Sequence, residues 1–261
     1  MPDDSSERIL RAQSASTMEL NSLIHESDEE ILVALLENPN IAEPHIVQML
    51  ERLDLSVPIL TAIAEKAKWN TSEVVRVGLA RHPKTPRRLA LAIVRQLYVF
   101  DLVRLSLLPS APAEIRRIAE EVLITRAPHL PAGEKLTLAR RGPARVVGAL
   151  LGEGHPQAVK LALANAFLTE SQILKVLANP SVPERVVTAI AQHPRWSVQH
   201  NIRLALTRNA YAPAPKALEF ICGFTLRDLQ DLAAQPDLPA HVARYIQKEL
   251  SRRSDDSRPQ H

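Results

Sequence analysis

The chain has 261 residues, of which 46% are hydrophobic, 3% aromatic and 23% charged, with 20 Pro, 7 Gly and 1 Cys. The scarcity of aromatic residues and glycines disfavours a β-rich fold, and a single cysteine excludes an internal disulfide. The formal net charge of +3 hides an asymmetry, because residues 1–56 carry 12 acidic and 3 basic side chains and the remainder carries a net +12. A basic remainder suits an anionic partner, although a solvated charged face is the simpler interpretation. Alanine- and leucine-rich segments punctuated by proline indicate an all-α protein.

The two ends of the chain are polar. Residues 1–16 are acidic and lack a sustained hydrophobic period, which predicts a flexible tail, and residues 254–261 predict another. The polar start does not resemble a signal peptide, and no apolar stretch is long enough to span a bilayer. A cytoplasmic protein is therefore expected.

Helix-start chemistry separates apolar segments of about 10–14 residues, near the usual helix length. A Ser or Thr followed three residues later by Glu or Gln fits the capping box, and a Pro in the first turn forfeits no hydrogen bond. Asn-Pro closes a helix because the residue before Pro avoids the α region. These patterns predict helix starts at Ser27–Glu30, Thr85-Pro86, Thr169–Gln172 and Ser181–Glu184, and helix ends at Asn38-Pro39 and Asn179-Pro180.

Residues 59–126 and 186–253 are two copies of one segment, related by 127 positions without a gap. Trp69 aligns with Trp196, and Thr61–Ala64 aligns with Thr188–Ala191. A long internal repeat predicts a repeat architecture, in which each helix pair buries its apolar face against its neighbours.

Upstream of residue 59 the register is expected to shift, because Asn38-Pro39 matches Asn179-Pro180 at 141 positions. On this interpretation the first copy contains 14 extra residues, roughly one helix. The expected organisation begins with a flexible acidic tail (1–16) and a first set of helical repeats (17–130). Bridging helices (131–168), a second set of repeats (169–253) and a flexible tail (254–261) follow.

One unit of the second set of repeats contains Asn179–Pro183, Ala189–Ala191, Pro194–Val198 and Ile202–Leu206. Through these residues the unit resembles HEAT-like helical repeats, most of all the leucine-rich-repeat-variant branch of bacterial α-solenoids. It departs from them in two ways. HEAT units place an Asp shortly before a Val-Arg pair, which is missing here, and the variant family's iron–sulfur cysteine cluster is excluded by the single cysteine. The resemblance implies an all-α, right-handed superhelical solenoid of stacked antiparallel helix hairpins, HEAT- or armadillo-like, with an internal duplication and a concave binding face. It implies no particular activity.

Residues that recur in both copies are interpreted as structural. Trp69 and Trp196 are the only tryptophans and occupy equivalent positions, so a wedge between helix hairpins is favoured over a platform for stacking bases. Arg76 and Arg203 are expected to bond neighbouring carbonyls or carboxylates. Asp101 and Asp228 are expected to be their acidic partners or helix caps.

Basic residues found in only one place are better binding candidates. Gly142-Pro143 breaks the chain between the copies, so one helix should end beside the start of the next, where a phosphate or an acidic partner would find cations and free N–H groups. A helix-end charge pair on a solvated surface is the alternative. The candidates are Lys135, Arg140, Arg141 and Arg145, with Arg87, Arg88, Arg116 and Arg117 as weaker pairs of the same type.

No metal, cofactor or catalytic residue is predicted. The 9 histidines are scattered without metal-ligand spacing, and the phosphate-loop, dinucleotide-binding and Gly-x-Ser-x-Gly patterns are missing. Cys222 is expected to be a buried small apolar residue.

Three functions remain open. The favoured one is a non-enzymatic scaffold that holds a protein or peptide partner on its concave face. The second is a nucleic-acid-binding HEAT-like protein that uses a basic concave surface. The third, by analogy with HEAT-like alkyl-base DNA glycosylases, is an enzyme that would use Trp69, Trp196, Asp101 and Asp228. The sequence does not predict the oligomeric state.

Overall fold

The structure is a computed structural model that describes residues 4–236 and 238–256, and all regular secondary structure in these ranges is helical. The expectation of an all-α protein is therefore confirmed for the described residues. The chain divides into two compact units, Met1–Thr125 and Arg126–His261. Each unit is described by itself below.

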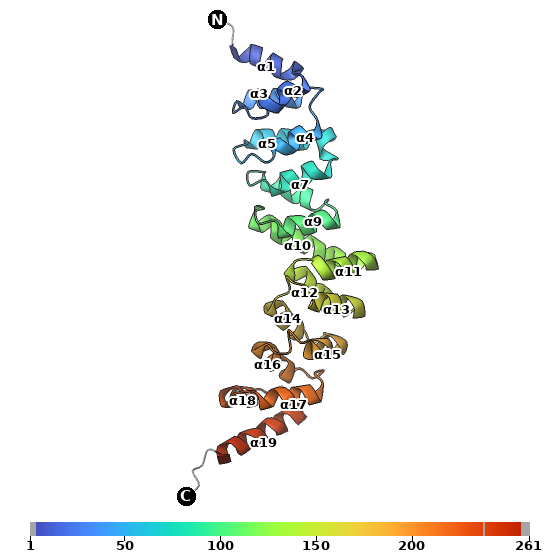
Figure 1. Cartoon of the computed structure of the whole chain (residues 1–261), viewed down its shortest axis with the longest axis vertical. Helices are drawn as coiled ribbons and strands as arrows, with labels where there is room; N and C mark the ends of the chain where they lie inside the picture. Colours follow the sequence, from blue (N-terminus) through green and yellow to red (C-terminus); the bar gives the residue numbers. More distant parts are fainter. Residues whose placement is uncertain (1–3, 237, 257–261) are drawn as a thin grey trace. The chain divides into compact units, whose positions relative to one another are not determined.

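The helices of the first unit follow one another in chain order (Figure 1). Helix α3 packs against α1 and α5, and α7 packs against α5, α8 and α9. These helices thus pack against near neighbours in sequence, and the side chains of Leu20, Leu35 and Ile63 are fully buried. The bounds are α1 (Asp4–Ser14), α2 (Thr17–Leu23), α3 (Glu29–Leu36), α4 (Glu43–Met49), α5 (Val57–Glu65), α6 (Ala67–Asn70), α7 (Glu73–Arg81), α8 (Arg87–Val94), α9 (Val99–Leu107) and α10 (Ala113–Arg126).

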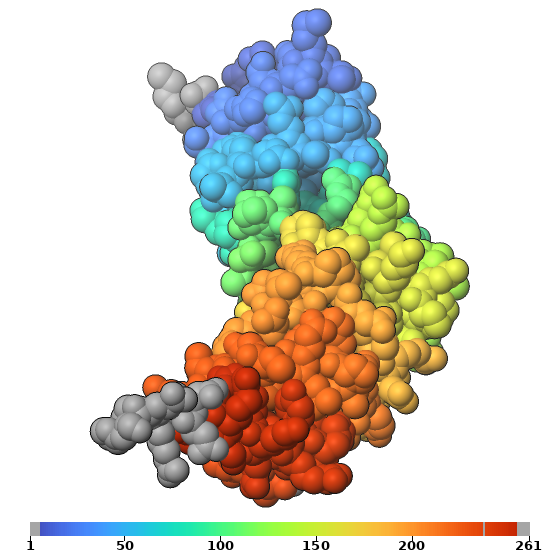
Figure 2. Space-filling model, turned by 60° about the horizontal axis from the view of Figure 1, so that its bottom comes forward, coloured from blue at the N-terminus to red at the C-terminus, as the bar shows by residue number. Residues whose placement is uncertain are grey.

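The second unit is built in the same way. After the short 3₁₀ turn Ala127–His129, helix α13 packs against α11, α12 and α15, and α16 packs against α14, α15 and α17. In the space-filling view its orange and red segments lie in successive layers (Figure 2). The bounds are α11 (Ala132–Arg141), α12 (Ala144–Glu153), α13 (Pro156–Leu163), α14 (Glu170–Leu177), α15 (Glu184–Gln192), α16 (His200–Arg208), α17 (Ala214–Cys222), α18 (Leu226–Ala233) and α19 (Ala240–Asp256).

The helix starts fall where the sequence places them, but the caps differ in detail. Asp28, not Ser27, is the N-cap of α3, and its side chain accepts the N–H of Glu30 at 3.0 Å. Thr169 is the N-cap of α14 without a side-chain cap bond. Pro86 and Pro183 are themselves N-cap residues rather than first-turn residues.

The 127-residue register holds along the whole described chain, which corrects the expected shift upstream of residue 59. Shifting the first unit by the separation of Trp69 and Trp196 places α3 on α13, α5 on α15 and α7 on α16 with identical bounds. Each other helix of the first unit also falls on one of the second, apart from α6, which falls on the turn at 194–198. No segment of 14 residues is inserted, and the match of the two Asn-Pro pairs is incidental.

A side-chain contact repeats with the same register. The carboxamide of Asn38 donates to the carbonyls of Ala12 and Ala15 at 2.8 and 3.0 Å. The carboxamide of Asn165, the residue 127 positions later, donates to the carbonyls of Ala139 and Gly142 at 3.1 and 3.3 Å. Both asparagines are 2% exposed. Since helix C-termini leave carbonyls without intrahelical partners, each Asn fastens α3 or α13 to the end of the helix two places earlier.

Two predicted segments are therefore reinterpreted. Residues 4–14 of the expected N-terminal tail form α1, and residues 131–168 are the second copy of residues 4–41 rather than a bridge. Residues 254–256 of the expected C-terminal tail continue α19, and residues 1–3 and 257–261 lie outside the described residues.

Of the helices in these segments, only α1 was not expected, and it packs through small buried residues. Ala12 and Ala139 are both 0% exposed at equivalent positions of α1 and α11, and Ala15 is buried beside them. Helix α1 has an apolar face but is polar on average, and this polar composition led to the expectation of a tail.

Candidate functional site

The second unit contains a groove of about 630 Å³ between α14 and α16 and the turns that follow them. This volume lies within the range of pockets that bind small molecules or peptide side chains. Arg208 is the only lining residue with a permanent charge. The lining residues are Leu174, Leu177, Ala178, Asn179, Pro180, Val182, Ala205, Arg208, Asn209, Ala210 and Tyr211.

The walls of the groove are apolar and its rim carries hydrogen-bond donors. Leu177 and Val182 are 6% and 3% exposed, so they form the floor, whereas Tyr211 on the rim is 48% exposed. Asn209 holds the rim in place, because its Oδ1 accepts the Tyr211 N–H at 2.9 Å and its Nδ2 donates to the Leu177 carbonyl at 3.3 Å. Asn179 is exposed beside them, and its Oδ1 accepts the Ser181 N–H at 3.0 Å.

At the matching place in the first unit, the arginine is paired with a carboxylate. Arg81, the counterpart of Arg208, binds the carboxylate of Glu51. Position 178, the counterpart of Glu51, is alanine, and Arg208 forms no ion pair within the described part of the chain. A first-unit cavity of about 190 Å³ overlaps this place, and its lining includes three carboxylates and two guanidinium groups, those of Glu51, Glu73, Asp101, Arg81 and Arg104. One copy thus presents a smaller cavity with charges of both signs, and the other presents a larger groove lined by Arg208 without an acidic residue.

The predicted cluster in the second unit is partly neutralised. The ammonium of Lys135 lies 3.9 Å from Glu153 and donates to the Pro128 carbonyl at 2.8 Å. Arg145 is half-buried and has an interaction partner. Arg140 and Arg141 are exposed at the end of α11, as expected, and have no carboxylate partner among the described residues.

The weaker pairs lie in the first unit. Arg87 binds Glu114 at 2.6 Å, and Arg117 binds Glu121 at 2.5 Å. Arg116 is half-buried, and its Nε has no hydrogen-bond partner, so it faces the protein rather than a ligand. Arg88 is exposed without a carboxylate partner among the described residues. The Arg87 guanidinium also lowers the pKa of the Glu114 carboxyl through their hydrogen bond.

The tryptophans are buried at both equivalent positions, where Trp69 is 2% and Trp196 3% exposed. Trp196 Nε1 donates to the Leu163 carbonyl at 2.8 Å, whereas Trp69 Nε1 has no partner. The cation of the preceding residue covers each ring, Lys68 at 4.4 Å and Arg195 at 4.2 Å from the centroid. Neither ring face is open to a stacked base, which fits the wedge interpretation.

The duplicated Arg and Asp residues make local contacts. Arg76 donates to Glu73 at 2.8 Å, while Arg203 donates to the Ser197 carbonyl at 2.7 Å. Neither Arg contacts the duplicated Asp expected as its partner. Asp101 lies 4.0 Å from Arg104.

Asp228 completes a capping box at the start of α18. Its carboxylate accepts from the Thr225 N–H at 2.9 Å and from the Thr225 hydroxyl at 2.6 Å. The Thr225 hydrogen bonds lower the pKa of this carboxyl. A cap of this kind stabilises a helix end.

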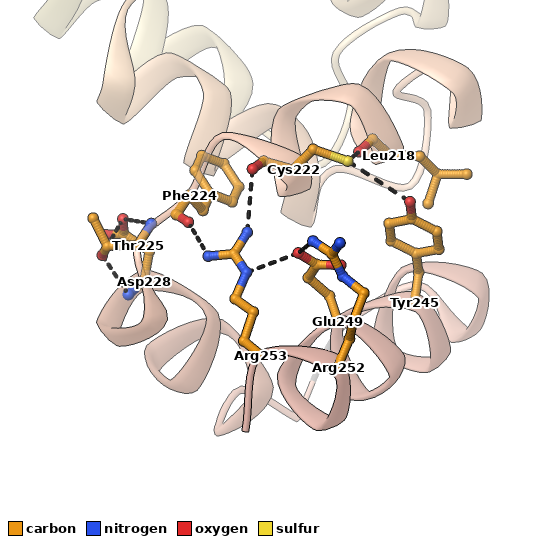
Figure 3. A network of polar contacts seen from close by, with 9 residues as sticks. All are labelled: Leu218, Cys222, Phe224, Thr225, Asp228, Tyr245, Glu249, Arg252 and Arg253. Atoms are coloured by element: carbon orange, nitrogen blue, oxygen red, sulfur yellow. Dashed lines mark hydrogen bonds and ion pairs between the residues drawn. The ribbon is translucent and has the colours of Figure 1, made fainter. Parts of the chain in front are cut away.

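Cys222 is exposed at the end of α17, which corrects the expectation of a buried residue. Its Sγ lies 3.5 Å from the Leu218 carbonyl and 3.7 Å from the Tyr245 hydroxyl of α19 (Figure 3). The contact with Cys222 raises the pKa of Tyr245. Helix α17 ends one residue before Gly223, so the thiol projects from the last turn instead of facing the core.

A ring of charged contacts fastens α19 to the end of α17 (Figure 3). Arg253 donates to the Phe224 carbonyl at 2.6 Å, to the Cys222 carbonyl at 3.1 Å and to Glu249 at 2.7 Å. Glu249 also accepts from Arg252 at 2.7 Å. The hydrogen bonds from Arg252 and then Arg253 lower the pKa of Glu249 to about 2. This network occupies its own donors and acceptors and therefore serves packing.

Among residues 4–236 and 238–256, no group of three or more His, Cys, Asp and Glu residues is placed to hold a metal ion. No helix in these ranges is long and apolar enough to cross a membrane. In comparisons with known proteins, no protein-family model matches the chain, and neither a curated protein nor a solved structure is significantly similar to it.

Sequence reasoning missed the groove because it broke the register upstream of residue 59. In the unbroken register Glu51 aligns with Ala178 and Arg81 aligns with Arg208. The replacement of Glu51 by Ala178, with the arginine retained as Arg208, was the sequence signal that could have located the groove. The assumed insertion of 14 residues concealed this alignment.

Proposed function

We propose that the protein is a non-enzymatic α-solenoid, HEAT-like in the sense of a right-handed superhelix of stacked helix hairpins, and that it binds a protein or peptide partner. Serial packing of near neighbours within each unit and the matched helix bounds of the two units support this architecture. Duplicated residues such as Trp69 and Trp196 serve the fold, so function belongs to positions where the copies differ.

The observation that carries the proposal is the groove between α14 and α16, whose Arg208 lacks the carboxylate partner that Glu51 provides for Arg81 in the first unit. Helical arrays bind partners along surfaces formed by successive units, and variable surface residues set the partner. An apolar floor with donors at the rim suits a segment of polypeptide, whose side chains and backbone need those two kinds of contact.

Selection of random peptides on the immobilised full-length protein tests the proposal. Hydrogen exchange measured with and without a selected peptide should then show protection of α14 and of residues 200–211. Failure to select any peptide would overturn the proposal, and so would protection confined to the corresponding helices α4 and α7 of the first unit.

Nucleic-acid binding stays a second candidate, because Arg88, Arg140 and Arg141 are exposed without carboxylate partners among the described residues. Arg87, Arg117 and Lys135 are engaged by carboxylates, which leaves fewer cations for phosphates. Binding of single- or double-stranded DNA or RNA that weakens steeply with added salt would support this candidate. A lack of binding at low salt would exclude it. The glycosylase alternative loses support because Trp69 and Trp196 are buried.

A further inference from the structure

We infer that the groove between α14 and α16 takes a peptide segment that carries a carboxylate beside an apolar side chain, with Arg208 as the group that binds the carboxylate. The inference rests on the proposed function and specifies the chemistry of its ligand. Three features of the groove lead to it.

The first feature is an unbalanced charge. In the first unit, Glu51 supplies the carboxylate that Arg81 binds. In the second unit, alanine at position 178 removes that carboxylate while Arg208 is retained, and the groove lining contains no Asp or Glu. The missing acid therefore marks the place where a ligand carboxylate fits, because the same backbone brings Glu51 to an arginine at that place.

The second feature is the geometry of a guanidinium at the edge of an apolar surface. A guanidinium presents parallel N–H groups that match the two oxygens of a carboxylate, and such a bond strengthens where apolar walls exclude water. Leu174, Leu177 and Ala205 supply those walls beside Arg208. An apolar side chain next to the ligand carboxylate would cover them.

The third feature is a set of donors and acceptors suited to a polypeptide backbone. Tyr211 projects its ring from the rim at 48% exposure, and the Asn179 amide nitrogen has no hydrogen-bond partner among the described residues. At the first-unit counterpart of Tyr211, the ammonium of Lys84 donates to the Asp54 carbonyl at 3.1 Å. The Lys84 side chain thus makes an internal contact in the first unit, whereas the Tyr211 hydroxyl and the Asn179 amide nitrogen make none among the described residues of the second.

The test restores the first-unit pair in the second unit. Ala178→Glu places a carboxylate opposite Arg208, as Glu51 lies opposite Arg81, so the variant should fold while closing the groove. Ala234→Glu is its matched control, because Ala178 and Ala234 are both exposed C-cap residues with right-handed helical backbone angles. Arg208→Gln removes the charge without adding bulk, and Arg227→Gln on the exposed surface of α18 is its control.

The probe is an array of nine-residue peptides with a central Asp or Glu between all pairs of Leu, Ile, Val, Phe and Ala. A matched array carries Asn or Gln at the centre. Binding of the full-length protein is measured by fluorescence polarisation at low salt, and far-UV circular dichroism verifies that each variant is folded.

The expected result is that acidic peptides bind, that their amide counterparts bind about tenfold or more weakly, and that Ala178→Glu and Arg208→Gln each weaken binding by a similar factor. Both controls should bind as the unaltered protein does. If amide peptides bind as well as acidic ones, the inference about the carboxylate is wrong although peptide binding stands. If acidic peptides bind equally to a folded Ala178→Glu variant, the groove is not their site. If no peptide of either array binds and none is selected at random, the proposed function itself fails.

Discussion

The two tryptophans allow one contact to be isolated by a matched pair of substitutions, Trp196→Phe and Trp69→Phe. Both side chains are buried to the same degree at equivalent places in the two units. Each substitution therefore removes a similar volume, and the cavity terms should largely cancel. The difference between the variants reports on the indole N–H.

The magnitude follows from the hydrogen bonds. Trp196→Phe leaves the Leu163 carbonyl without the donor it has at 2.8 Å, and an unsatisfied buried group costs about 1–3 kcal/mol. Trp69→Phe removes a buried N–H that already lacks a partner, which relieves a penalty of the same kind. Trp196→Phe should therefore destabilise the protein by about 2 kcal/mol more than Trp69→Phe does.

Hydrogen exchange with mass spectrometry measures this difference in each unit of the full chain, and urea unfolding followed by circular dichroism provides the overall comparison. Exchange should accelerate in α13 and α16 of Trp196→Phe more than in the equivalent helices α3 and α7 of Trp69→Phe. Equal acceleration in the two variants, or a larger effect at Trp69, would refute the reasoning.

Three further predictions concern the backbone, a buried amide and acid stability. Gly154→Ala should destabilise the second unit by about 1–2 kcal/mol or more in thermal unfolding, because Gly154 has a φ of 76° and a Cβ there would lie 2.8 Å from Pro183 Cγ. Gly152 has open space around it, so Gly152→Ala should be neutral or stabilising in the same measurement. Asn165→Asp should lower the free energy of unfolding by about 2 kcal/mol or more in urea, since it places a carboxylate oxygen against two carbonyls. Asn179→Asp at the exposed surface should change it by about 0.5 kcal/mol or less. Similar losses of stability in the two variants would contradict the Asn165 contact. The pKa of Glu249 is lowered from 4.5 to about 2, so its ionised carboxylate contributes stability above pH 4.5 that is lost as the pH falls from 4.5 towards 2. In Glu249→Gln, the free energy of unfolding should therefore depend less on pH over that interval.

Local patterns in the sequence determined much of the fold. Ser, Thr and Pro at the segment starts located helix boundaries such as Glu29, Glu170 and Glu184, because capping chemistry acts over a few residues. The gap-free match of 59–126 with 186–253 placed equivalent helices in both units, and composition disfavoured a β-rich fold.

Only the tertiary structure showed the features that depend on contacts between residues distant in sequence. Helix α1 is recognised as a copy of α11 by its buried alanines and by the contact of Asn38 with the carbonyls of residues 12 and 15. Many different sequences can form a helix face of this kind, so the sequence of residues 4–14 does not identify it. The candidate site depends on whether an acid lies opposite an arginine 30 residues away, as Glu51 does for Arg81. Helix propensity and hydrophobic period are properties of one segment, whereas the opening of a groove depends on which side chains two packed segments bring face to face.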